Sequence, residues 1–155
     1  YSVTWSLDAR TGRTTDQMLK IVQASTEEAP DVAIIALGVN DVTHGVPRAA
    51  WLRQMSALLA LLKARGTRQI IVTALPPMGQ FPLLPQPLRW IIGRQATRFD
   101  AGLARLAASD PAIHHLSIPV ETPTPDLMAE DGFHPAPPLY ALWAEAVATR
   151  IRAAM

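Results

Sequence analysis

The chain has 155 residues, of which 49% are hydrophobic and 17% are charged, and these proportions predict one globular domain spanning residues 1–155. The formal net charge of +1 predicts neither a nucleic-acid partner nor a polybasic membrane anchor, and no apolar run is long enough for a membrane span. Because the chain has no cysteine, disulfides, thiolate catalysis and zinc–thiolate sites are excluded.

The opening segment, Tyr1–Ala9, alternates apolar and polar residues, with Val3, Trp5 and Leu7 on the apolar side. A period of two predicts a half-exposed strand at the edge of a sheet. Because the chain starts inside this strand without a lead-in, we expect that residues before Tyr1 have been lost or removed.

A helix and a buried strand come next. Thr14-x-x-Gln17 resembles a capping box that opens the helix, and Pro30 ends it. The run Asp31–Leu37 is apolar without alternation, which predicts a strand buried on both faces of a parallel sheet. The same succession repeats, with a helix from Pro47 to Gly66, a buried strand at 69–75, a Pro-rich loop at 76–87, a helix at 88–108, a short strand at 113–120 and a last helix from Pro138.

The alternation of strands and helices predicts a three-layer α/β/α sandwich with parallel strands. In such sheets the reactive groups gather at the carboxyl ends of the strands. Gly12, Asn40 and the loop after Leu75 fall at strand ends in this assignment. The loop that contains Asp131 and His134 can fold over the same edge, so we expect a site there.

Two short motifs carry candidate chemistry. Asp131 and His134 lie three residues apart, so the carboxylate can orient the imidazole while the other ring nitrogen faces a reacting group. Asn40, in the segment Gly38-Val39-Asn40-Asp41, offers a side-chain amide donor at the end of a buried strand, where an oxyanion can form. The activated serine that would complete such a site is not evident.

The chain resembles the SGNH (GDSL-type) hydrolase superfamily over essentially its whole length. The resemblance rests on the glycine in Ala9-Arg10-Thr11-Gly12-Arg13, on the Gly-x-Asn-Asp segment at 38–41 and on Asp-x-x-His at 131–134. It implies a flavodoxin-like parallel sheet of strand order 2-1-3-4-5 and a serine esterase or acyl hydrolase that acts on small ester substrates without a metal or cofactor. It also implies that His134 is the general base, that Asp131 orients it, and that Asn40 and the Gly12 backbone N–H bind the oxyanion.

The family's Gly-Asp-Ser segment, which carries the nucleophile just after the first strand, is absent from this sequence. None of the serines present, at positions 2, 6, 25, 56, 109 and 117, lies in a comparable turn. We therefore expect that a few tens of residues, with the first strand, the serine and a following helix, precede Tyr1.

The implied strand order places that missing strand between Tyr1–Ala9 and Asp31–Leu37. Without it, two rows of backbone N–H and C=O groups in the middle of a sheet would lack partners, which is costly. We expect that the N-terminal piece of the same protein, or a strand from a neighbouring molecule, fills the slot. Direct pairing of the two strands, or an empty slot, would count against this expectation.

Several of these residues also have a structural interpretation. The Asp131–His134 pair can be a simple ion pair in a loop before a helix, and Asn40 can be a turn residue that caps the next segment. Gly12 can serve only to supply a positive φ angle, which is compatible with a donor role for its N–H. For Asp41 we favour a structural role, holding its loop by hydrogen bonds.

A metal site formed by His44, His114 and His115, with Asp41, is a further alternative. Neighbouring residues on a strand point to opposite faces, so His114 and His115 are not expected to bind one ion. Trp90 and Phe81 are candidates for lining an acyl pocket, and the 76–87 loop for a wall of the substrate cleft.

Two other functions stay open beside the esterase. One is a non-catalytic α/β binding or association module that keeps the scaffold without the nucleophile, and the other is metal-dependent hydrolysis. No residue distinguishes short-chain esters, lysophospholipids, thioesters and acetylated sugars as substrates. The compartment and the oligomeric state are equally open.

Overall fold

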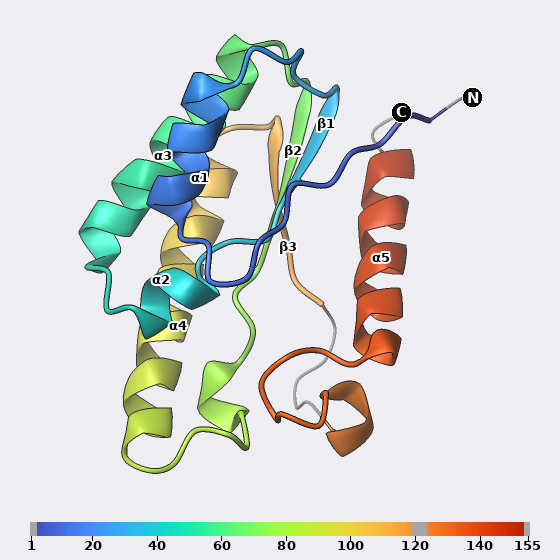
Figure 1. Ribbon diagram of the computed structural model, residues 1–155. Coiled ribbons are helices and arrows are strands. Elements are labelled where there is room, and N and C mark those ends of the chain that lie inside the picture. Colours follow the sequence, from blue (N-terminus) through green and yellow to red (C-terminus); the bar gives the residue numbers. More distant parts are fainter. Residues whose placement is uncertain (1–2, 119–123, 154–155) are drawn as a thin grey trace.

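A parallel sheet of three strands forms the centre of the computed structural model, which describes residues 3–118 and 124–153 (Figure 1). The strands are β1 (Val32–Ile35), β2 (Gln69–Thr73) and β3 (Ile113–Leu116), in the order β1-β2-β3. Ile35 lies opposite Val72, and Val72 lies opposite His115. The strands expected at 31–37, 69–75 and 113–120 are thus present and shorter than expected, with residues 119 and 120 outside the described part. The positions of the other two strands of the implied order stay a prediction.

Helices cover both faces of the sheet (Figure 1). Those on one side are α1 (Thr15–Ala24), α3 (Arg48–Ala64) and α4 (Leu88–Ala108), and α5 (Pro137–Arg152) lies on the other. The two histidines of β3 show this division, because His115 contacts Asp100 of α4 whereas His114 contacts Arg150 of α5. The predicted three-layer arrangement is confirmed, and so is the predicted opposite orientation of the two histidines.

The core lies between the sheet and the layer of α1, α3 and α4. Trp51 of α3 and Ile70 of β2 are 0% exposed, and Trp51 stacks on Phe99 of α4 with 4.6 Å between the ring centroids. On the opposite face, Trp143 of α5 donates a hydrogen bond to the Thr73 hydroxyl at 3.1 Å. The apolar stripe predicted for the helix after Pro47 is therefore core.

Residues 3–9 do not form the strand that their alternation predicts. Val3, Trp5 and Leu7 are 81%, 80% and 78% exposed, and the segment runs irregularly toward α1 (Figure 1). A strand needs a neighbouring strand for its backbone groups. This chain supplies none beside residues 3–9, so the prediction of an edge strand is wrong for the chain taken alone.

β1 has a free outer edge. One edge pairs with β2, and within residues 3–118 and 124–153 no strand pairs with the other. Ile34, in the middle of β1, is 44% exposed. Residues 3–9 and β1 do not pair directly, and no strand of the described residues lies between them, so the expectation of a filled slot is wrong for this chain taken alone. An occupant from outside the chain stays a prediction.

The short helical elements were not predicted. These are α2 (Val39–Thr43) and the two 3₁₀ turns η1 (Met78–Gln80), inside the Pro-rich loop, and η2 (Pro125–Leu127). Among the longer helices, α4 has the predicted bounds and α5 starts one residue early, whereas α1 ends at Ala24, well before Pro30. In the part of the chain that the structure describes, no helix is long and apolar enough to cross a membrane.

Candidate active site

The segments with the predicted site residues lie at one end of the sheet. In Figure 1 the turn before α1, the short helix α2, the η1 turn and the loop before α5 all lie beyond the carboxyl ends of the strands. Reactive groups gather at this edge in parallel α/β sheets. The segments that contain Gly12, Asn40 and His134 therefore share the edge on which chemistry is expected.

The loop with Asp131 and His134 is a tight turn closed by backbone hydrogen bonds. The N–H of Ala129 donates to the carbonyl oxygen of His134 at 2.8 Å, and the N–H of Gly132 donates to the carbonyl oxygen of Ala129 at 2.9 Å. Gly132 has a φ angle of +64°, which favours glycine at this position. The turn places Asp131 and His134 side by side.

Asp131 and His134 make the contact that their spacing suggests. His134 Nδ1 lies 2.6 Å from Asp131 Oδ2, and Asp131 Oδ1 accepts the backbone N–H groups of Phe133 and His134, each at 2.9 Å. The hydrogen bond from His134, with those from the two backbone groups, lowers the pKa of Asp131 to about 2. An ionised Asp131 can hold the imidazole in one tautomer, with Nε2 left to face a reacting group.

This turn rests on the Pro-rich loop after β2. Phe133 meets Phe81 edge to face with 5.4 Å between the ring centroids, and Phe81 is 3% exposed. A Cβ atom on Gly132 would lie 3.4 Å from the backbone nitrogen of Leu83. The 76–87 loop therefore supports the Asp131–His134 turn. Trp90 is 57% exposed whereas Phe81 is buried, and a shared acyl pocket stays a prediction.

The ends of the Gly38–Asp41 segment are structural. Gly38 has a φ of +122°, and a Cβ atom there would lie 3.1 Å from the side chains of both Trp51 and Leu75. The Asp41 carboxylate is 0% exposed and accepts hydrogen bonds from the N–H of Thr15 at 3.1 Å and from its hydroxyl at 2.9 Å. Burial raises the pKa of Asp41, although these hydrogen bonds oppose the shift. As predicted, Asp41 holds its loop, here to the first residue of α1.

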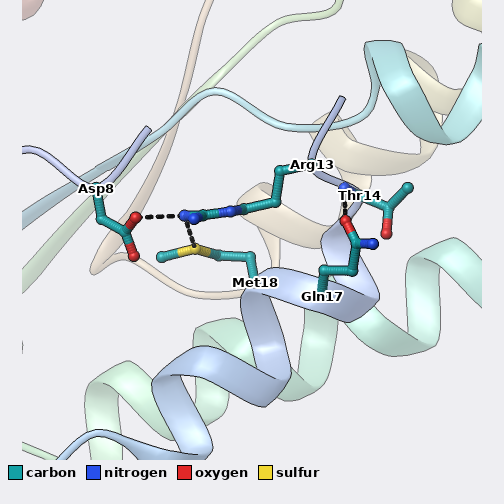
Figure 2. Close-up of polar contacts among 5 residues, drawn as sticks. All are labelled: Asp8, Arg13, Thr14, Gln17 and Met18. Atoms are coloured by element: carbon teal, nitrogen blue, oxygen red, sulfur yellow. Dashed lines mark hydrogen bonds and ion pairs between the residues drawn. The ribbon is translucent and has the colours of Figure 1, made fainter. Parts of the chain in front are cut away.

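Asn40, between these two residues, points toward the Gly12 turn. Its amide donates a hydrogen bond at 3.0 Å to the backbone oxygen of Arg13, the residue after Gly12. Figure 2 shows the Arg13 side chain held by an ion pair with Asp8 and by the sulfur of Met18 at 3.5 Å. The structure thus brings Asn40 and the Gly12 turn together and leaves the amide's second N–H for another acceptor.

Gly12 itself lies on the surface. Its φ of +78° is the positive value that a turn residue needs, and the position of a Cβ atom would have no atom within 4 Å. A hollow of about 490 Å³ borders it, lined by residues 10–13 and by side chains of α1 such as Gln17 and Lys20. Gln17 accepts the backbone N–H of Thr14 at 3.0 Å, as the capping motif predicts, and so fixes the start of α1 beside the hollow (Figure 2).

No hydrogen bond joins the two halves of the predicted site within the described residues. Among the residues that the structure describes, no hydrogen bond joins Asp131 or His134 to Asn40 or Gly12, and none joins His134 to a serine. The described serines lie in the irregular opening segment, at helix ends, on α3 and after β3, and Ser2 is outside the described residues. Within the described residues, no serine is hydrogen-bonded to His134, and a common site for the two halves stays a prediction.

The histidines considered for a metal site are dispersed. His44 follows α2 and its Nδ1 contacts the backbone oxygen of Asn40 at 2.5 Å. His114 and His115 face opposite layers of the fold. His114 and His115 are adjacent in the sequence, but because they face opposite sides of the sheet they do not form one set of metal ligands.

Two contacts near the site were missed by the sequence analysis. The Asp100 carboxylate accepts the N–H of Leu75 at 2.9 Å and contacts His115 Nε2 at 2.8 Å, so it fixes the point where the Pro-rich loop leaves β2. Arg13 joins Asp8 to the Asn40 amide. Arg13 adjoins Gly12 in the sequence and could have been considered. Asp100 and His115 lie on different elements, and no local pattern connects them.

Comparison with known proteins identifies relatives. The sequence model of the GDSL-like Lipase/Acylhydrolase family matches residues 1–142. A GDSL-like esterase of Mycobacterium tuberculosis is 31% identical over 133 residues, which cover 81% of this chain and 41% of that protein. The chain thus spans about two fifths of that relative's length.

Solved structures share the fold at lower sequence identity. A GDSL-like lipase of Bacteroides thetaiotaomicron superposes with a TM-score of 0.71 and 20% identity over 93% of this chain and 73% of that one. A psychrotrophic esterase, EstA of a Pseudoalteromonas species, gives a TM-score of 0.68 and 20% identity over 91% and 74% of the two chains. These similarities confirm the parallel α/β fold.

Proposed function

Since the chain belongs to the GDSL-like lipase/acylhydrolase family, we propose that it is part of a serine hydrolase that cleaves carboxylic esters through an acyl-enzyme. The observation that carries this proposal is the contact of 2.6 Å between His134 Nδ1 and Asp131 Oδ2. It leaves Nε2 of an oriented imidazole free to remove a proton, as a general base must.

In the proposed mechanism, a serine from a segment N-terminal to Tyr1 attacks the ester carbonyl while His134 takes the hydroxyl proton. Asp131 holds the imidazole and stabilises its positive charge. His134 then returns the proton to the leaving alcohol, and water resolves the acyl-enzyme by the same route. His134 and Asp131 are thus the catalytic pair in this proposal.

The second N–H of the Asn40 amide and the backbone N–H of Gly12 bind the oxyanion of the tetrahedral intermediate, together with the N–H of the serine itself. The proximity of Asn40 to the Gly12 turn, through the Arg13 carbonyl, supports this assignment. Loss of one such donor typically lowers kcat by about 10²–10³-fold.

The segment with the serine would also supply the strand for the free edge of β1. The slot between residues 3–9 and β1, the exposed Ile34 and the exposed alternating side chains of residues 3–9 all support this placement. The greater length of the Mycobacterium tuberculosis relative is compatible with it.

The test is the hydrolysis of p-nitrophenyl acetate by the protein with its preceding segment, compared with its His134→Ala variant. We expect kcat/KM to fall by about 10⁴-fold or more, because the serine loses its base. His114→Ala is the matched control, since His114 lies on β3 and contacts Arg150 of α5, and neither belongs to the proposed site. Full activity in His134→Ala would overturn the role of His134.

A fluorophosphonate probe separates the enzyme from a non-catalytic module. We expect the probe to label a serine that precedes Tyr1, and a chelator to leave hydrolysis unchanged. Absence of labelling in the protein with its preceding segment would favour the binding module, and loss of hydrolysis on chelation would favour metal-dependent chemistry.

A further inference from the structure

Large apolar side chains are exposed at the start of α4 and in the loop before it. Leu83 and Trp90 are each 57% exposed, and Leu88 and Ile91 are each 45% exposed. Such side chains are normal when scattered singly, but a group of them marks a site of interaction. These four come from a stretch of nine residues.

Helix geometry places the α4 members of this group on one outward face. At 100° per residue, Leu88, Trp90, Ile91, Arg94 and Arg98 fall within an arc of roughly 160°. All five are exposed. Gly93 and Ile92 lie outside this arc and pack inward, Gly93 against η1. The face therefore combines apolar side chains with two guanidinium groups.

The stretch of chain that forms this surface carries positive charges only. Between Pro76 and Phe99 the sequence contains Arg89, Arg94 and Arg98 and neither aspartate nor glutamate. The Arg94 guanidinium lies 4.7 Å from the centroid of the Trp90 ring, a cation–π arrangement that presents both groups together. A partner that fits here offers apolar chains and negative charge.

The surface is connected to the proposed active site. Arg89 donates hydrogen bonds to the backbone oxygens of Leu84, at 2.5 Å, and Pro82, at 3.3 Å, which fastens the loop to the first turn of α4. On its other side the same loop contacts Gly132, between Asp131 and His134. What binds at α4 is thus brought next to the catalytic pair.

We propose that Leu83, Leu88, Trp90, Ile91, Arg94 and Arg98 form a surface that binds anionic lipid bilayers or micelles. The apolar side chains enter the acyl region, the Trp90 ring lies at the interface and the two arginines contact lipid phosphates. Because the surface adjoins the catalytic pair, lipid esters would be the substrates presented to it, a consequence that rests on the proposed function. Adsorption to the lipid surface does not depend on the proposed function.

The experiment measures co-sedimentation with vesicles of phosphatidylcholine alone and of phosphatidylcholine with 30% phosphatidylglycerol. It uses the full-length protein with His134→Ala, so that hydrolysis plays no part in the result. We expect binding to the anionic vesicles only, weakened by added salt, with a blue shift of tryptophan fluorescence as Trp90 leaves water.

Two variants of the α4 surface distinguish the contribution of the arginine charges to vesicle binding from that of the apolar side chains. Each arginine near an anionic surface contributes about 1 kcal/mol, or roughly fivefold in binding, so Arg94→Glu with Arg98→Glu should weaken partition by about 25-fold or more. Trp90→Ser with Ile91→Ser should weaken it and abolish the blue shift. The matched controls are Arg53→Glu, on α3, and Tyr140→Ser with Leu142→Ser, an exposed apolar pair on α5.

Unchanged thermal melting of each variant establishes that it is folded. The proposal is overturned if the protein does not bind anionic vesicles, as expected if this surface instead contacts another protein, or if the control variants weaken binding as much as the α4 variants. Vesicle binding by a protein that hydrolyses no ester would leave this inference standing and reject the proposed function, so the two failures are distinguishable.

Discussion

Each of the side chains proposed to act on the ester is oriented by a neighbour whose own position is fixed. The His134 side chain is 59% exposed, and it is oriented by Asp131 and by the Phe133 ring, which meets it edge to face with 5.3 Å between the centroids. Asp131 is in turn held by two backbone N–H groups of the turn. Asn40 uses one amide hydrogen on the Arg13 carbonyl, which restricts its rotation and directs the other.

At this scale we predict the effect of Asp131→Asn in the protein with its preceding segment. The amide cannot stabilise an imidazolium and can favour the wrong imidazole tautomer, so kcat should fall by about 10⁴-fold with little change in KM. Steady-state kinetics with p-nitrophenyl acetate measures this. A similar fall in Asp126→Asn, an aspartate of η2 outside the pair, would indicate a general effect of charge instead.

The pH profile gives a second check on the same residue. A lowered pKa of about 2 means that the Asp131 carboxylate is ionised throughout the pH range in which esterases are assayed. The contribution of Asp131 to the stability of the fold is present above the ordinary pKa of an aspartate and is lost as the pH falls toward 2. Activity lost on the acid side above pH 4 should therefore not reflect Asp131. Titration of the Asp131 carboxyl above pH 4, followed by NMR, would contradict this.

Among the elements, the Pro-rich loop after β2 connects the sheet to the catalytic pair. Asp100 holds its start through the N–H of Leu75, and Phe81 within it supports Phe133. The loop approaches α4 so closely that a Cβ atom on Gly93 would lie 2.5 Å from the Cα atom of Gly79. The neighbouring atoms belong to the backbone of Gly79, so no side chain can rotate to make room for a Cβ atom on Gly93.

We accordingly predict that Gly93→Ala destabilises the protein by about 1–3 kcal/mol through overpacking. The higher helix propensity of alanine, worth about 1 kcal/mol, would not offset this fully. Urea unfolding measures the change. Gly102→Ala is the matched control in the same helix, because its Cβ atom would meet only the flexible Leu52 side chain, at 3.0 Å. Equal stability of the two variants would contradict the close contact of α4 with η1.

For the whole molecule, the main consequence of the fold is an unfinished sheet. β2 has a strand on each side, whereas β1 and β3 each have a partner on one side only among the described residues. Exposed strand edges invite pairing with other chains. The exposed alternating residues 3–9 and the free edge of β1 are therefore the part of the fold that a preceding segment would stabilise most.

The corresponding prediction concerns amide hydrogen exchange in the protein with its preceding segment. If a strand fills the slot, the amides of β1 should exchange as slowly as those of β2, because both strands then have partners on both sides. Mass spectrometry of peptides from β1 and β2 measures this, with β2 as the internal reference. Rapid exchange of alternate β1 amides would show that the edge stays free.

The sequence by itself determined the parallel α/β architecture, the bounds of α4 and the Asp131–His134 pair, because apolar periodicity and a three-residue spacing are local properties of the chain. It failed at residues 3–9, where alternation predicts a strand but pairing needs a neighbour. Only the tertiary structure decided that Asn40 lies beside the Gly12 turn, that Asp100 contacts His115, and that Leu88 and Ile91 face outward. These facts depend on which elements pack together, and packing is set by contacts between residues far apart in the chain.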